Sequence, residues 1–169
     1  MLLRRHLRGF ASLLSGLLLL GCASTGFDGR VYKDDEVHFR VGPVPNSWRR
    51  LEVDDTRLAF RDDAANATVA VNGRCGLDGD DVPLASLNQH LFLQFTDRTL
   101  LSQTTLSLDG REALRSELSA ALDGVKKRYL VYVLKKDSCV YDFMYIAADS
   151  APGSRADFER FVQGFAALE

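Results

Sequence analysis

The 169-residue sequence predicts an α+β domain, in which helices pack on the faces of an antiparallel sheet of about six to seven strands as an α/β/α sandwich. Three observations lead to this prediction. Tight turns divide residues 102–148 into four extended runs, these runs are apolar on both faces, and two other segments carry apolar residues at helical spacing. A chain that is 46% hydrophobic and 26% charged can bury the core of one such domain.

The turns lie at Asp109-Gly110, Asp123-Gly124 and Asp137-Ser138. Asp-Gly between extended runs favours a type I′ hairpin turn, which needs a positive φ at both central residues, and Asp-Ser is a weaker form of the same signal. The runs between the turns are rich in Val, Leu, Tyr, Thr and Phe. We therefore predict a meander with strands at 102–108, 111–122, 125–136 and 139–148.

The last two strands of this meander are apolar on both faces. A strand with one solvated face alternates apolar and polar residues. In the middle of 125–136 and of 139–148, both the odd- and the even-numbered positions are apolar, and only Asp142 interrupts them. Each face of the sheet must therefore be covered. Helices from elsewhere in the chain are the candidates.

The remaining elements are predicted from shorter patterns. Strands are expected at 37–41, 57–61 and 68–72, with a short apolar run at 51–53 between the first two. Asp81 as cap and Pro83 in the first turn predict a helix over 83–96, and Ser154 is the expected cap of a final helix that reaches Leu168. The apolar stripes of these two helices are Leu84, Leu87, Leu91 and Phe95, and Phe158, Phe161, Val162, Phe165 and Leu168.

Residues 1–21 have the pattern of an export signal. Three arginines precede an apolar run at 10–20, which is too short to span a bilayer. The ending Leu19-Leu20-Gly21-Cys22 resembles the bacterial lipobox, which implies a signal peptide at 1–21, acyl chains such as palmitate on Cys22 and a lipidated tether at 22–36. Ala23 favours the outer membrane, facing the periplasm. The alternative is an ordinary signal peptide with a chance cysteine.

The order of motifs in residues 37–168 resembles the PsbP-like superfamily, which includes PsbP, DcrB lipoproteins and Ran-binding Mog proteins. The motifs are a strand, Pro45-Asn46-Ser47-Trp48, two strands, a helix, the sequence Asp-Gly-Arg-Glu-Ala at 109–113, the meander and a Phe-rich final helix. The resemblance implies a single α/β/α domain over 37–169 that serves in binding or assembly. It carries no catalytic residue.

The sequence lacks the usual signatures of catalysis or of cofactor binding. His38 and His90 lie in no nucleophile motif, no Cys/His cluster has zinc-ligand spacing, and Asp78-Gly79-Asp80 fails as a calcium loop because Pro83 replaces the required Gly. Without residues 1–21 the chain has 18 basic and 23 acidic residues, a formal charge of −5, which argues against nucleic acid. No cofactor, no metal and no enzymatic activity are expected.

The function expected from these patterns is that of an envelope lipoprotein, anchored by acyl chains on Cys22, that binds an envelope protein or a small apolar ligand. One alternative is a periplasmic carrier of lipids or small molecules, or an accessory to an envelope transporter. The other is a hydrolase whose site is not recognised.

Cys75 and Cys139 form an even pair once Cys22 is acylated. An oxidising compartment favours a disulfide between them. Two buried free thiols are the alternative, because sequence alone does not bring their Cα atoms within bridging distance.

The register of the meander brings three charged residues together on one face. Two-residue turns place Ser107 opposite Glu112, Glu112 opposite Lys135, and Val133 opposite Asp142, so that Lys135 is diagonal to Asp142. Glu112, Lys135 and Asp142 then form either a partly buried ion cluster or the polar rim of a binding groove. An unpaired buried carboxylate is costly, so a partner for Asp142 is expected in both cases.

Overall fold

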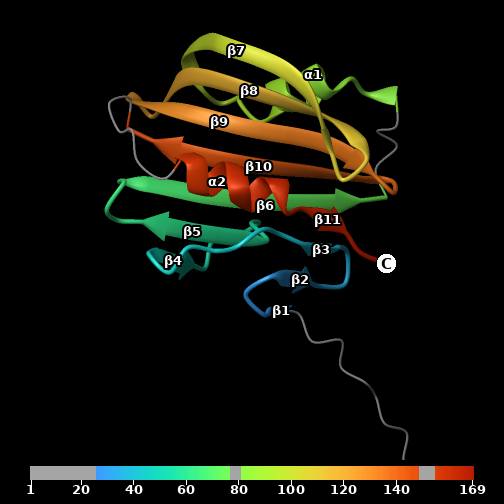
Figure 1. Cartoon of the computed structure of the whole chain (residues 1–169). Helices are drawn as coiled ribbons and strands as arrows, with labels where there is room; N and C mark the ends of the chain where they lie inside the picture. Colours follow the sequence, from blue (N-terminus) through green and yellow to red (C-terminus); the bar gives the residue numbers. More distant parts are fainter. Residues whose placement is uncertain (1–25, 77–80, 149–154) are drawn as a thin grey trace, which may run out of the picture.

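The computed structural model describes residues 26–76, 81–148 and 155–169, which form two antiparallel sheets and two helices (Figure 1). The larger sheet has seven strands in the order β4-β5-β6-β10-β9-β8-β7. Its strands are β4 (Trp48–Leu51), β5 (Leu58–Asp62), β6 (Ala67–Cys75), β7 (Thr96–Leu108), β8 (Arg111–Leu122), β9 (Val125–Lys136) and β10 (Cys139–Ala147). The predicted α+β class is confirmed.

The predicted meander is confirmed in its turns and its register. All three turns have positive φ at both central residues: 49° and 73° at Asp109-Gly110, 50° and 78° at Asp123-Gly124, and 53° and 59° at Asp137-Ser138. These are the values that a type I′ turn requires. Ser107 pairs with Glu112 and Val133 with Asp142, as predicted.

The helix predicted at 83–96 is shorter, and the strand after it is longer. Helix α1 covers only Leu84–His90, its N-cap is Pro83 without a side-chain hydrogen bond, and Asp81 does not cap it. The next residues continue as turns that still bury Phe92, whose ring lies 5.3 Å from that of Tyr129. Apolar spacing therefore predicted the buried face but not the end of the helix, because consecutive turns can bury residues at a similar spacing.

The two faces of the larger sheet are covered differently. On one face α1 packs over β8 and β9, in a core that includes Phe92, Tyr129 and Val131. On the other face α2 (Arg155–Gln163) lies across β10 and β6, as Figure 1 shows, and buries Phe158 and Phe161. Both faces of β9 and β10 are covered, as their apolar pattern predicts, whereas β7 is mostly exposed.

A second sheet covers the rest of the α2 face, and the sequence analysis missed most of it. Its order is β1-β2-β3-β11, from Gly26–Phe27, Val31–Lys33, His38–Arg40 and Ala166–Ala167. The tether expected at 22–36 is therefore corrected over 26–36, because Tyr32 is buried and stacks on Phe39 at 5.2 Å. Such short strands give almost no periodic signal.

The final helix is also shorter than predicted. It ends at Gln163, and the chain then turns into β11, which pairs with β3. Phe165 is buried beside Tyr141 and Phe143, so it belongs to the core without being helical. The predicted cap Ser154 lies outside the described residues, as do Cys22 and Asp78-Gly79-Asp80.

Candidate functional site

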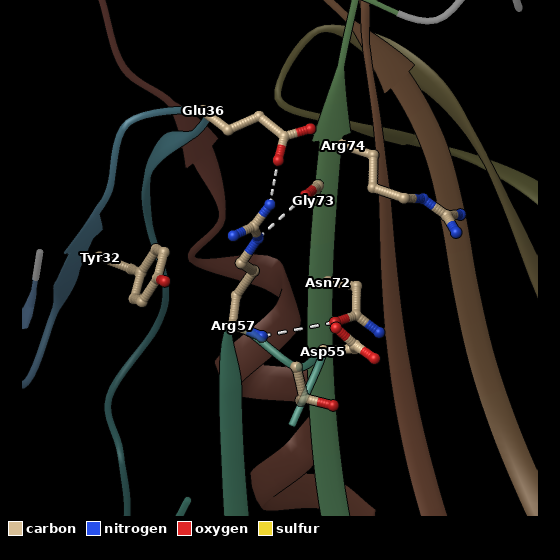
Figure 2. Close-up of a pocket in the computed structure, with 8 residues that line it drawn as sticks. Tyr32, Glu36, Asp55, Arg57, Asn72, Gly73 and Arg74 are labelled. Carbon is tan, nitrogen blue, oxygen red and sulfur yellow. Dashed lines mark hydrogen bonds and ion pairs between the residues drawn. The ribbon is translucent and has the colours of Figure 1, made fainter. Parts of the chain in front are cut away.

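Two neighbouring cavities lie where the smaller sheet meets strands β4, β5 and β6. Each has a volume of about 530 Å³, and Tyr32, Thr56 and Arg57 line both. Figure 2 shows the first cavity, with Arg57 at its centre between the ring of Tyr32 and the side of β6. The second is lined by aromatic rings together with Arg50 and Glu52. We call the two together the Arg57 groove.

Arg57 joins the two sheets. Its Nη1 donates to Asp34 Oδ2 at 2.7 Å and its Nε donates to the Gly73 carbonyl at 3.2 Å, while Nη2 pairs with Glu36. Glu36 also accepts from the backbone N–H of Cys75 at 2.9 Å. The loop between β2 and β3 is thus held on β5 and β6 by charge-assisted hydrogen bonds, which are stronger than neutral ones.

Asp34 is the main acidic partner of this clamp. Burial by itself would raise the pKa of its carboxyl group, but donors outweigh that effect: the backbone N–H groups of Val37 and Glu36, the Tyr32 hydroxyl and the charge of Arg57. The net result is a lowered pKa, so the carboxylate is ionised at neutral pH. Its side chain is only 8% exposed, which makes it dependent on Arg57.

The second cavity contains an arginine whose guanidinium lies over two aromatic rings that contact each other. The guanidinium carbon of Arg50 lies 5.5 Å from the ring centre of Phe27 and 5.7 Å from that of Phe60. Its Nη2 donates to the Arg57 carbonyl at 3.3 Å, and its Nε is 3.7 Å from the carboxylate of Glu52. Cation–π contacts of this kind hold the guanidinium plane in place.

Two buried donors in this cavity have no hydrogen-bond acceptor among the described residues: Arg50 Nε and Trp48 Nε1. Both residues point to the same face of β4, since they are two apart in the strand. A buried donor without an acceptor costs about 1–3 kcal/mol, so native proteins rarely leave one unless a ligand or water binds there. Two residues that line this cavity thus each carry a buried donor without a hydrogen-bond acceptor among the described residues.

Sequence reasoning missed this groove because no motif marks it. Arg50 and Arg57 are separated in sequence from Asp34 and Glu36, and the segment that carries these two acids was predicted to be part of a tether. The only local signal is the placement of Trp48 and Arg50 on one face of a short strand. That signal has meaning only once the strand is known to lie at an edge.

Two of the three residues predicted to form a polar rim meet at a separate cavity. Glu112 and Lys135 line a space of about 380 Å³ beside the start of α1, together with Pro83, Leu84, Gly110 and Arg111. Lys135 Nζ donates to the Val82 carbonyl at 3.0 Å. Asp142 lies on the same face of the sheet, as the register requires, but it does not line this cavity.

Asp142 is instead buried beside β6, with 3% of its surface exposed. Its Oδ2 is 3.7 Å from Arg74, whose side chain is half exposed, and burial raises the pKa of the Asp142 carboxyl group. In one amide orientation Asn72 donates to Asp142 Oδ1 at 3.5 Å; in the reverse orientation it donates to the Asp55 carbonyl at 3.1 Å. We favour the second, because 3.5 Å is long for a hydrogen bond, and because the reversed amide donates to two carbonyls, those of Asp55 and of Val71 at 3.2 Å.

The remaining candidates have separate places. Cys75 and Cys139 form a disulfide between directly paired residues of β6 and β10, with Cα atoms 4.0 Å apart. The Nδ1 of His38 lies 2.9 Å from the carbonyl of Glu169, and His90 is exposed in the last turn of α1. Within residues 26–76, 81–148 and 155–169, His, Cys, Asp and Glu form no group of three or more that could hold a metal.

Comparison with known proteins identifies the fold. The sequence matches no protein-family model and no curated protein. Among solved structures, the chain is similar to cyanobacterial PsbP (CyanoP) from Synechocystis sp. PCC 6803, with a TM-score of 0.58, 14% identity, and coverage of 89% of this chain and 99% of that one. The chain has the PsbP-like fold, as the motif order predicted.

Two further structures share this fold. LpqN of Mycobacterium tuberculosis, described as involved in cell envelope biogenesis, aligns with a TM-score of 0.53 and 15% identity over 80% of this chain and 87% of that one. A protein from Bacteroides thetaiotaomicron aligns with a TM-score of 0.55 and 10% identity over 78% of this chain and 45% of that one. Separately, no described helix is both long and apolar enough to cross a bilayer.

Proposed function

We propose that the protein is an envelope lipoprotein, anchored by acyl chains on Cys22, whose folded domain binds a partner or ligand without catalysing a reaction. The Arg57 groove is the observation that carries this proposal. Five of the six charged side chains that line it form ion pairs, the exception being Asp55, and its described lining contains no histidine, cysteine or lysine. Such a groove is suited to recognition.

The position of the groove supports anchoring close to a membrane. Gly26 and Phe27 line the second cavity, and Gly26 is four residues from Cys22. Four residues span at most about 14 Å. Acyl chains on Cys22 would therefore hold the groove near the bilayer surface. LpqN, which has the same fold, is described as involved in cell envelope biogenesis, and this is compatible with the proposed role.

Two experiments test this function. Labelling with alkyne palmitate should mark the wild-type protein and leave Cys22→Ser unmarked; equal labelling would contradict the lipid anchor.

A photo-crosslinking amino acid at Thr56, which lines both cavities, should capture a partner in native envelopes. The same amino acid at Thr104, exposed on the distant strand β7, is the matched control and should capture nothing. Equal capture at both positions would contradict a role for the groove.

A further inference from the structure

We propose that the second cavity of the Arg57 groove binds a small organic acid, with its carboxylate on Arg50 and Trp48 and its apolar part between the aromatic walls. This inference rests on the proposed binding function and names its ligand class. It begins from the two buried donors, Arg50 Nε and Trp48 Nε1, which lack an acceptor among the described residues. Both side chains belong to residues that line the same cavity.

The chemistry of these donors selects an anion. A guanidinium N–H and an indole N–H can only donate, so the ligand must supply an acceptor. A carboxylate has two acceptor oxygens and forms strong hydrogen bonds with arginine. The guanidinium of Arg50 lies over both Phe27 and Phe60, whose rings contact each other, and these contacts orient it before a ligand arrives.

The walls select an apolar or aromatic body. Phe27, Tyr32, Trp48 and Phe60 all line this cavity of about 530 Å³. Pockets for small ligands typically combine apolar and aromatic walls with a few polar groups that set orientation. A bare inorganic anion would leave these rings without a contact, so a small carboxylic acid with a ring or short apolar chain fits better.

Glu52 forms a weak ion pair with the Arg50 donor that the ligand carboxylate would use. Its carboxylate is 3.7 Å from Arg50 Nε, too far for a good hydrogen bond, and its side chain is 90% exposed. Such an exposed ion pair is weak and can open at little cost. A ligand carboxylate would displace Glu52 from Arg50, so removing the charge of Glu52 should strengthen binding.

The test uses the single tryptophan of the chain, Trp48, as the reporter. In the full-length ¹⁵N-labelled protein, benzoate should shift the indole N–H resonance of Trp48 saturably. Benzamide, which has the same ring without the charge, should bind at least tenfold more weakly, and inorganic phosphate should produce no saturable shift. Arg50→Gln should weaken benzoate binding roughly tenfold, as expected for the loss of one charge-assisted hydrogen bond. Glu52→Gln should strengthen it.

Arg49→Gln is the matched control. Arg49 neighbours Arg50 but points to the opposite face of β4, where it pairs with Asp63 at 3.5 Å and is 62% exposed. Benzoate affinity should be unchanged in this variant. If Arg50→Gln does not fold, Arg50→Lys is used in its place. Because this variant keeps the positive charge, it should retain the preference for benzoate over benzamide.

Three outcomes would overturn the ligand class: equal affinity for benzoate and benzamide, equal losses in Arg49→Gln and Arg50→Gln, or weaker binding in Glu52→Gln. Crosslinking at Thr56 that persists in Arg50→Gln would leave the proposed binding function standing while the ligand class fails. The two proposals can therefore fail separately.

Discussion

Asp142 shows how one residue can couple the stability of the fold to pH. Its carboxyl group is buried in the face of the sheet that carries α1, and burial raises its pKa above the ordinary value of 3.8. The half-exposed Arg74, 3.7 Å away, offsets only part of this effect. The predicted cluster of Glu112, Lys135 and Asp142 placed Asp142 on the correct face of the sheet. Only Glu112 and Lys135 line the cavity beside α1, however, and Asp142 does not.

Asp142→Asn should therefore stabilise the protein at pH 7. As pH rises, the Asp142 carboxyl group loses its proton in the unfolded chain at a lower pH than in the folded chain. The wild-type fold therefore loses stability between pH 3.8 and the raised pKa of Asp142. Each unit of that difference is worth about 1.4 kcal/mol. Urea unfolding at pH 7 and at pH 3 should show a gain for the variant that disappears at the lower pH.

Asp123→Asn is the control for this measurement, because Asp123 is exposed in a turn where Asn is also accepted. Asp123→Asn should change the free energy of unfolding little at both pH 7 and pH 3. A larger loss for Asp142→Asn at pH 7 than at pH 3 would show that the carboxylate is ionised and stabilised in the fold.

At the scale of elements, Arg57 connects the smaller sheet to the larger one. It is the shared partner of Asp34 and Glu36 and also donates to the Gly73 carbonyl. Arg57→Met should destabilise the fold by about 2 kcal/mol, because the nearly buried Asp34 loses its charged partner. Hydrogen exchange should accelerate most in β2 and β3.

Arg49→Met is the control, since Arg49 forms an exposed ion pair with Asp63 whose value is about 0–1 kcal/mol. It should change the free energy of unfolding little and leave exchange in β2 and β3 unaltered. Equal acceleration of exchange in β8 and β9 of the Arg57 variant would show global loosening rather than release of the smaller sheet.

The end of α2 lies too close to Gly42, which follows β3, for any side chain at that position. Gly42 donates its N–H to the Phe161 carbonyl at 2.7 Å, and a Cβ at Gly42 would lie 2.2 Å from the carbonyl oxygen of Arg160. Gly42→Ala should therefore cost at least about 2 kcal/mol, because the clash is with backbone rather than with a flexible side chain. Gly26→Ala, with no atom within 4 Å of its Cβ, should change the thermal midpoint little.

The sequence predicted the elements whose information is local. Residues 111–122 and 125–136 form strands with the predicted bounds, because Asp-Gly turns fix both ends and the apolar runs are long. The sequence did not predict the elements that depend on contacts between distant segments. Strand β1 has two residues and exists because Phe27 packs on Phe60, 33 positions along the chain, with ring centres 5.9 Å apart.

The candidate site was less predictable than the fold for the same reason. Glu112 and Lys135 could be placed together because both belong to the meander, whose register follows from its turns. The Arg57 groove combines β1 and β2 with β4–β6, and no repeating pattern relates these segments. Trp48 Nε1 and Arg50 Nε lack a hydrogen-bond acceptor in the described part of the chain because of how distant segments pack around them, and no local sequence pattern indicates that packing.

At the scale of the whole molecule, the sheet consists of two halves that meet at one pair of strands. Strands β4–β6 form the first half and the meander β7–β10 the second, and they join where β6 pairs with β10. The Cys75–Cys139 disulfide crosses this junction at one end and closes a sequence separation of 64 residues. It thus ties the strands most distant in sequence among those that are neighbours in the larger sheet.

The disulfide should therefore contribute strongly to the stability of the whole domain. Loop-closure entropy for a separation of 64 residues corresponds to about 4 kcal/mol, so Cys75→Ser/Cys139→Ser should unfold at clearly lower urea concentration. Thiol counting decides whether the bond forms. In a Cys22→Ser background, alkylation of the denatured protein should find no free thiol before reduction and two after it. Two thiols before reduction would mean that the halves are held by strand pairing and packing alone, and the double variant should then be nearly as stable as its parent.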